Sequence, residues 1–399
     1  MANVSSSNGI EQRPKLRFPG FTDDYYESTL GEIFEYERPD SYIVSSEKYS
    51  DNYSIPVLTA NQAFILGYTN ETTGVYRKGP VILFDDFTCD MKYADFPFKV
   101  KSSAMKLLTT KDEMPLFYGY NLLQHINYKP GGHARHWISI MQPISVLVPG
   151  LDEQKKVSAF LELVNQKIKK QQEIIALLKK YKRGVSNKVF NEVHADKDST
   201  IIDFADAFVL LQNNTFSRDC LTIEEAEILN IHYGDILVKY GAVVDTSVDA
   251  IPYIREGIDV SKYSSNSYLK NGDVVFADTA EDYAVGKVCE IFHADGRKIL
   301  SGLHTMPFRP TFICAPMYLG YYLNSAAYRV QVLPMIQGAK VSSISKSEIR
   351  KTKLYIPSLA RQQQIVNVLY ALDQRIDHAE RILEALKKAK TGLLQHLFV

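Results

Sequence analysis

Two segments of this 399-residue chain match each other at a constant offset of 208 residues without a gap. Two unrelated amphipathic helices could share an apolar spacing, but not the same flanking residues at one offset. The chain is therefore predicted to consist of two homologous halves. The matches pair Pro149-Gly-Leu-Asp-Glu-Gln154 with Pro357-Ser-Leu-Ala-Arg-Gln362, Leu178-Lys-Lys180 with Leu386-Lys-Lys388, Gly184 with Gly392, and Phe190 with Phe398.

Both segments carry apolar residues at alternating spacings of four and three residues, which is the pattern of a coiled-coil seam. A proline precedes each segment at a position that a helix start tolerates. Each helix is expected to run for about 37 residues, or roughly 55 Å, with Gly184 and Gly392 weakening the last turns. The predicted seam residues are Val157, Leu161, Val164, Ile168, Ile175, Leu178, Ile365, Leu369, Leu372, Ile376, Leu383 and Leu386.

The residues before each helix are rich in Tyr, Phe, Val and Ile, with frequent Gly, Pro and Asp, which is typical of short strands and turns. We predict strands over 80–85, 235–240 and 272–277, strand-like segments at 55–58 and 137–140, and shorter helices around 116–125 and 317–329. The expected fold class is α+β. It has a mixed domain over 1–150 with a loose tail at 1–10, a helix over 151–191, a second mixed domain over 192–357, and a helix over 358–399.

Neither helix could bury its apolar stripe alone, so the two helices are expected to pair with each other as an antiparallel coiled coil. A pseudo-two-fold axis would then relate the halves. Two-fold-related modules that are not identical would suit a duplex with two different half-sites at a fixed separation.

Composition excludes some classes of protein. No apolar run approaches the roughly 20 residues of a membrane span, and residues 1–10 lack the basic and apolar parts of a secretory signal, so a cytoplasmic location is expected. The cysteines show no metal-ligand spacing and are expected to be reduced, structural thiols. They are Cys89, Cys220, Cys289 and Cys314.

The net charge is zero, but it is unevenly distributed. Residues 152–188 hold ten Lys and Arg against four Asp and Glu, and residues 360–399 hold six against four. The two large blocks are therefore acidic, so binding to DNA would depend on local patches and on partner subunits.

The paired Pro-x-Leu-x-x-Gln helix starts, the Lys-rich helix ends and the opening Pro14-Lys-Leu-Arg-Phe-Pro-Gly-Phe21 resemble the specificity subunits of type I restriction-modification systems. The resemblance covers nearly the whole chain. It implies two domains that each read one half of a split, asymmetric target in double-stranded DNA. It also implies helices that set the spacing and dock two methyltransferase subunits, with restriction subunits joining through the methyltransferases. Arg361 departs from the pattern, because the first copy has Glu153 there.

Catalytic signals are missing. The chain has no phosphate-binding Gly-x-x-x-x-Gly-Lys-[Ser/Thr] loop, no Asn/Asp-Pro-Pro-aromatic methyltransferase motif and no glycine-rich cofactor loop. We therefore expect a non-catalytic subunit without a metal or cofactor of its own. S-adenosylmethionine, ATP and Mg would bind to its partners.

Base reading requires side chains that donate to or accept from base edges. For each predicted contact the alternative is an ordinary surface turn. In the first domain the candidates follow the strand-like segment at 55–58 or lie in the loop Gly131–His136. In the second domain they follow 272–277 or lie in the loop that matches 131–136. The candidate DNA-binding residues are Thr59, Asn61, Gln62, His133, Arg135, His136, Asp278, Thr279, His304, Gln337 and Lys340.

The helices carry polar residues that are candidates for docking partner subunits. The predicted docking residues are Gln154, Lys155, Lys179, Lys180, Gln362, Lys387 and Lys388. Two other functions compete with DNA reading: a coiled-coil adaptor that assembles proteins without touching DNA, which the zero net charge favours, and a self-contained nuclease or methylase, which the missing motifs disfavour.

Overall fold

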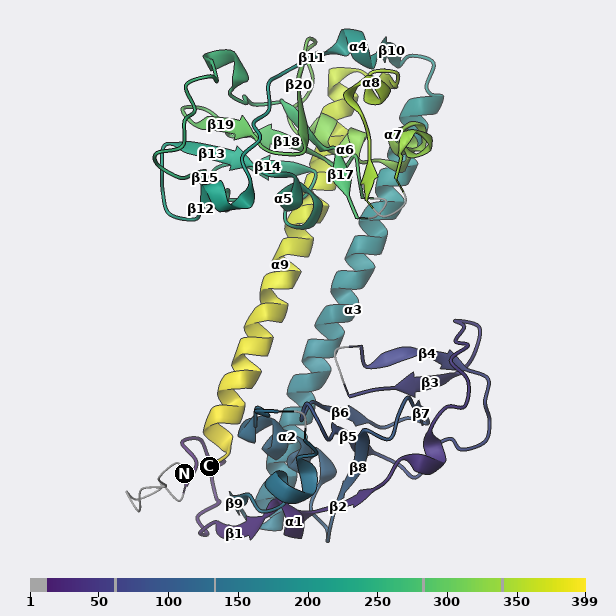
Figure 1. Cartoon of the computed structure of the whole chain (residues 1–399), viewed down its shortest axis with the longest axis vertical. Coiled ribbons are helices and arrows are strands. Elements are labelled where there is room, and N and C mark those ends of the chain that lie inside the picture. The colour runs from purple at the N-terminus through teal and green to yellow at the C-terminus, as the bar shows by residue number, and fades with distance from the viewer. Residues whose placement is uncertain (1–12, 61–62, 133, 282–283, 339–340) are drawn as a thin grey trace. The chain divides into compact units, whose positions relative to one another are not determined.

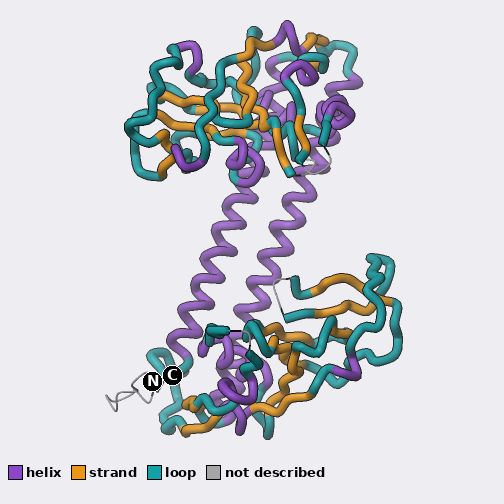
Figure 2. The backbone as a smooth tube through the Cα atoms, viewed as in Figure 1, coloured by secondary structure: helices purple, strands orange, loops and turns teal. Residues whose placement is uncertain are grey.

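The computed structural model describes residues 13–60, 63–132, 134–281, 284–338 and 341–399. The chain divides into two compact units. Unit 1 comprises residues 1–173 and 381–399, and unit 2 comprises residues 174–380. Figures 1 and 2 show short strands and loops in each unit together with parts of two long helices, α3 (Leu151–Ala195) and α9 (Leu359–Leu397). The α+β class is confirmed. Among the described residues, no helix is both long and apolar enough to cross a bilayer.

Unit 1 is built on an antiparallel sheet in the order β2 (Phe34–Glu37), β8 (Met105–Thr110), β5 (Val81–Asp85), β6 (Met91–Ala94). A second sheet has the order β4 (Ile65–Thr69), β3 (Ile55–Leu58), β7 (Lys99–Val100), and β1 (Tyr26–Thr29) pairs with β9 (Ser145–Val148). Helix α1 (Leu30–Ile33) follows β1, and α2 (Leu116–Ile126) packs on β5, β6 and β8.

Strand β5 is buried on both faces. Ile82 and Phe84 belong to the cluster that contains α2, Trp137 and the long helices, whereas Val81 and Leu83 belong to a second cluster with Tyr76 and Phe98. Successive side chains of a strand point to opposite faces, so one continuous apolar run can serve two cores. The predicted strands at 80–85 and 55–58 and the helix at 116–125 are confirmed.

Unit 2 contains a mixed five-stranded sheet in the order β11 (Phe208–Leu210), β20 (Thr305–Pro310), β16 (Val274–Ala277), β18 (Val288–Phe292), β14 (Val243–Asp245). A four-stranded sheet has the order β12 (Leu221–Thr222), β15 (Tyr253–Ile254), β13 (Ile228–Ile231), β19 (Lys298–Ser301). Two short pairs join β10 (Thr200–Asp203) to β22 (Lys353–Ile356) and β17 (Thr279–Ala280) to β21 (Ser342–Ser343).

The short helices of unit 2 are α4 (Phe204–Ala207), α5 (Tyr233–Val238), α6 (Tyr318–Leu323), α7 (Ala326–Val332) and α8 (Lys346–Ile349). The predicted helix around 317–329 is therefore two helices. Ser325 separates them, because its side chain accepts the backbone N–H of Tyr328 and caps α7. The strand predicted at 272–277 is confirmed as β16.

Two predicted strands were wrong. Residues 235–240 lie largely in α5, which begins where the side chain of His232 accepts the N–H of Gly234. Residues 137–141 form a π-helical turn, in which Trp137 and Met141 are buried while Ile138 and Ile140 are exposed. In both places local capping or burial at helical spacing outweighed the β-branched composition.

In each unit, α3 and α9 pack against each other and run antiparallel. In unit 1, Val157 and Leu161 of α3 share a cluster with Leu397 and Phe398 at the end of α9. In unit 2, the later part of α3 meets the earlier part of α9, where Lys179 pairs with Glu380 (2.7 Å) and Lys182 with Asp373. The helices have 45 and 39 residues, against the roughly 37 expected for each, so α3 is the longer of the two and α9 is close to its expected length.

The predicted seam residues on α3 and α9 are all buried or half-buried. Gly184 and Gly392 lie inside the helices rather than ending them. Once a helix is held by tertiary packing, a single glycine costs only about 1 kcal/mol relative to alanine.

The glutamine of the repeated helix start has a structural role in both copies. Gln154 Nε2 donates to Pro149 O (2.7 Å), and Gln362 Nε2 donates to Pro357 O (2.8 Å). Gln362 Oε1 also accepts the N–H of Ala315 (2.8 Å). Both glutamines are buried and hold the chain that enters the helix, which explains why Pro-x-Leu-x-x-Gln occurs twice.

Gly320 on α6 lies against the chain at Ala242, so Gly320→Ala should destabilise unit 2. An added Cβ would overlap the Ala242 carbonyl oxygen, which is backbone and cannot rotate away. Overpacking of this kind costs roughly 1–3 kcal/mol, and we expect the upper end of that range. Chemical denaturation of Gly320→Ala and of Gly392→Ala, whose Cβ would meet nothing within 4 Å, provides the test. Equal stability of Gly320→Ala and the wild type would contradict the expected clash.

Candidate nucleic-acid interface

The two loops that were predicted to contact DNA in unit 2 lie side by side. Thr279 and Ala280 of β17 pair with Ser343 and Ser342 of β21. Gln337 forms a further bridge to Ser343, and the N–H of Ile344 donates to Asp278 O (2.9 Å). Segments about 60 residues apart in sequence therefore form one ordered edge.

His304 joins this edge from a third segment. The N–H of Asp278 donates to His304 O (3.1 Å), and Asp278 Oδ1 accepts from the Thr279 hydroxyl (2.8 Å) and lies 3.3 Å from His304 Nδ1. Both the carboxylate and the imidazole are partly exposed. Four predicted residues, Asp278, Thr279, His304 and Gln337, are thus brought together, and we call them the unit 2 cluster.

Gly338 explains the shape of the adjoining loop. Its φ is +110°, a conformation that favours glycine, and an added Cβ would overlap the carbonyl oxygen of Val341. The glycine of the Gly-x-Lys pattern is therefore required by the backbone. Lys340 lies outside the described residues.

Sequence reasoning missed the residues beside His304. The Tyr233 ring lies edge-on to the His304 ring at 5.3 Å, and the His232 ring lies 4.7 Å from Tyr233. Arg218 pairs with Asp235 (2.8 Å) and has a nitrogen 3.3 Å from His232 Nδ1. Burial, and then the positive charge of Arg218, lower the pKa of His232, which favours the neutral ring. No sequence signal joins these residues, because their proximity arises only from the fold.

In unit 1, the predicted loop Gly131–His136 is anchored by Asp86. Asp86 Oδ1 accepts the N–H of Trp137 (2.8 Å). Asp86 Oδ2 lies 3.5 Å from Lys106 Nζ and 3.9 Å from the guanidinium of Arg135. The guanidinium of Arg135 lies over the Phe87 ring, 5.6 Å from its centroid, and the side chain is half-exposed. Arg135 therefore faces solvent while its position is held by Phe87 and Asp86.

The structure argues against a direct DNA contact by His136. The residue as a whole is only 3% exposed. Its backbone N–H donates to Asp86 O (2.9 Å), and its Nδ1 lies 3.2 Å from the same oxygen. His136 anchors the loop, and His133 lies outside the described residues.

Thr59 lies in a different part of unit 1. It follows β3 in the three-stranded sheet, and its N–H donates to Phe64 O (3.1 Å), closing the loop toward β4. Asn61 and Gln62 lie outside the described residues. Arg135 is held by Asp86, which follows β5 in the four-stranded sheet. Thr59 and Arg135 therefore lie beside different sheets of unit 1.

The predicted docking residues divide into two groups. Gln154 and Gln362 are only 2% and 1% exposed and serve the helix starts, so the structure argues against a docking role for them. The lysines lie on exposed helix faces: Lys155, Lys179, Lys180, Lys387 and Lys388. Sequence reasoning missed an exposed apolar row on α3 in unit 2, formed by Ile174, Leu177 and Tyr181.

The described residues contain no group of three or more His, Cys, Asp or Glu side chains placed to hold a metal ion. The unit 2 cluster consists of hydrogen-bonding side chains on a loop edge, and such groups can donate to or accept from base edges.

Comparison with known proteins gives one family model that matches the chain twice and one curated relative that matches most of its length. The model of the type I restriction modification DNA specificity domain matches residues 22–180 and again residues 222–388. A curated relative, the type I restriction enzyme EcoR124I/EcoR124II specificity subunit of Escherichia coli, is 27% identical over 380 residues, covering 86% of this chain and 85% of the relative.

Solved structures share the fold. The type I restriction-modification S subunit from M. genitalium superposes with a TM-score of 0.59 at 15% identity, covering 97% of this chain and 99% of that chain. A structure described for complex assembly and conformational transition of the type I R-M system has a TM-score of 0.53 at 14% identity, covering 96% and 98%.

The family model matches each half of the repeat, so the duplication inferred from the 208-residue offset is a duplication of a DNA specificity domain. This finding disfavours the adaptor hypothesis. With most of its residues matched in two copies, the chain belongs to the family of type I restriction-modification DNA specificity subunits.

Proposed function

We propose that each half of this chain reads one half of a bipartite, asymmetric DNA target, and that the paired helices set the number of base pairs between the half-sites. The observation that carries the proposal is the gapless repeat, together with the convergence of the unit 2 cluster on one loop edge. Two homologous but different reading surfaces suit an asymmetric split site.

The helices would also dock two methyltransferase subunits, through the exposed lysines named above. Restriction subunits would join through the methyltransferases in the cytoplasm. Methylation and ATP-dependent cleavage would belong to that complex, with S-adenosylmethionine, ATP and Mg bound by the partners.

Mapping methylated bases in host DNA by single-molecule sequencing tests the proposal. We expect modification at two half-sites, on opposite strands, separated by a constant number of base pairs. Indiscriminate methylation by the purified complex, or methylation by this chain alone, would overturn the proposal.

Asp278→Ala should weaken discrimination at one half-site only. A carboxylate at a loop edge can accept from a cytosine amine or hold a neighbouring donor in place. Loss of one such contact costs about 1–3 kcal/mol, or roughly fivefold to 150-fold in selectivity. Methylation rates on duplexes altered at each half-site measure the effect.

Glu256→Ala, which removes an exposed acid of unit 2 outside the cluster, is the matched control. An equal loss at both half-sites would place Asp278 outside the reading surface of unit 2.

A further inference from the structure

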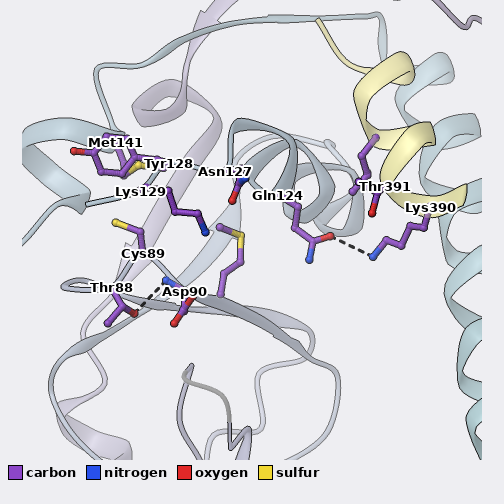
Figure 3. A pocket seen from close by; sticks show the side chains of 12 residues that line it. Thr88, Cys89, Asp90, Gln124, Asn127, Tyr128, Lys129, Met141, Lys390 and Thr391 are labelled. Atoms are coloured by element: carbon purple, nitrogen blue, oxygen red, sulfur yellow. Dashed lines mark hydrogen bonds between the residues drawn. The ribbon is translucent and has the colours of Figure 1, made fainter. Parts of the chain in front are cut away.

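A cavity of about 410 Å³ in unit 1 receives a lysine from the end of α9. It is bounded by the turn between β5 and β6, by the end of α2 and by α9. Figure 3 shows Lys390 reaching from α9 to Gln124, with Lys129 and Asp90 also lining the space. Nothing in the predicted DNA-reading or docking residues accounts for this lysine.

The repeat identifies the counterpart of Lys390 as Lys182, 208 residues earlier. In unit 2, Lys182 pairs with Asp373, and the Tyr321 hydroxyl donates to the same carboxylate (2.7 Å). The charge of this lysine is therefore neutralised within the protein.

The corresponding acid is missing from the first repeat. Asn165 occupies the position that matches Asp373. Lys390 Nζ instead donates to the neutral Gln124 Oε1 (3.3 Å), and Gln124 Nε2 donates to the Tyr120 hydroxyl (3.0 Å). Within the described part of the chain, no carboxylate forms an ion pair with Lys390.

A half-buried ammonium without a carboxylate favours an anion from outside. Burial lowers the pKa of Lys390, because the charged form loses solvation that Gln124 only partly replaces. Lys129 adds a second positive charge at the rim, and Asp90 is the acid among the lining residues, so the lining has a net charge of about +1.

The cavity adjoins the loop that presents Arg135. Tyr128 lines the cavity, and its ring lies 5.9 Å from that of His136, so the two ends of the 129–135 segment are close together. Gly131 and Gly132 have open space where a Cβ would stand. Arg135 is half-exposed at the second end, so a strand of DNA that touches Arg135 would pass this opening.

We propose that the cavity seats one backbone phosphate of the bound DNA, with Lys390 as the half-buried donor and Lys129 as the cation at the rim. The proposal rests on the proposed DNA-reading function and adds a sequence-independent contact specific to unit 1. In unit 2 a cavity of about 750 Å³ contains the counterpart lysine, Lys182, but its charge is neutralised there by Asp373.

The test uses the complex of the full chain with its cognate methyltransferase and measures DNA affinity across a range of salt concentrations. Lys390→Gln should lower the slope of log affinity against log salt by about 1, which corresponds to one phosphate contact. Affinity should fall roughly tenfold for cognate and non-cognate duplexes alike. Lys390→Arg should retain the slope, and Lys197→Gln, which removes an exposed lysine of unit 2, is the charge-matched control.

An unchanged slope and affinity for Lys390→Gln would overturn the proposal. So would an unchanged slope combined with weaker assembly of the methyltransferase in the absence of DNA, because the anion would then be a partner carboxylate. The proposed function fails by a separate result, in which the wild-type complex does not distinguish cognate from non-cognate DNA.

Discussion

Replacing residues 192–357 with the corresponding block of another specificity subunit should change one half of the methylated target and leave the other half unchanged. The block contains the whole unit 2 cluster, whereas Thr59 and Arg135 lie outside it. Methylation at the original second half-site should fall by a factor of about 10³ or more, the usual span between specific and non-specific binding. Sequencing of methylated DNA from cells carrying the hybrid measures both halves at once.

The structure places one condition on the hybrid. The main core of unit 2 includes Phe190, Ile365, Val366 and Leu369, which lie on the long helices outside the replaced block. The donor block must pack against these side chains, since core mismatches cost several kcal/mol. Replacing residues 1–150 instead is the matched control and should change the other half-site. Coupled changes in both half-sites would contradict independent reading.

Glu290→Gln should remove a pH-dependent loss of stability from unit 2. The Glu290 carboxylate lies in the core, where its two oxygens accept the N–H groups of Met317 (2.6 Å) and Gly320 (2.8 Å) at the start of α6. Burial raises the pKa of Glu290 to about 8, and the backbone hydrogen bonds only partly oppose this rise. The folded protein therefore retains a proton that the unfolded chain releases near pH 4.5.

Because the folded state binds more protons between these two values, its free energy of unfolding falls as pH rises from about 5 to 8. The decrease from this group is at most about 3–4 kcal/mol, since one proton contributes about 1.4 kcal/mol per pH unit. Glutamine cannot ionise, so the stability of Glu290→Gln should stay level from pH 5 to pH 8 while that of the wild type falls. The amide NH2 cannot accept the second backbone N–H, so the variant should start about 1–3 kcal/mol below the wild type near pH 5. Denaturation at several pH values gives the difference, with the exposed Glu256→Gln as control. Parallel curves for Glu290→Gln and the wild type would show that Glu290 is ionised in the fold.

The long helices could be predicted because their information is local. An apolar spacing of three and four residues and a proline at each start specify a paired helix without reference to the rest of the chain. The short elements were less predictable. Residues 235–240 contain the β-branched side chains of a strand, but the cap by His232 and packing in the core made them helical.

The candidate site divides in the same way. Residue type and position after a strand singled out Asp278, Thr279, His304 and Gln337, but not their convergence, which depends on the pairing of β17 with β21. The same reasoning selected Gln154, Gln362 and His136 as surface residues, although each is buried with hydrogen bonds to nearby backbone oxygens. A polar side chain has the same appearance in a sequence whether it binds a partner or its own backbone.

The sequence by itself determined that this chain is a duplication with two long helices, because a gapless repeat and a heptad pattern persist along the chain. Only the tertiary structure decided which polar residues face outward, that Tyr233 and Arg218 lie near His304 and His232, and that Lys390 lacks the acid its counterpart Lys182 has. These features depend on contacts between segments far apart in sequence, and burial and electrostatics are set by such contacts rather than by local pattern.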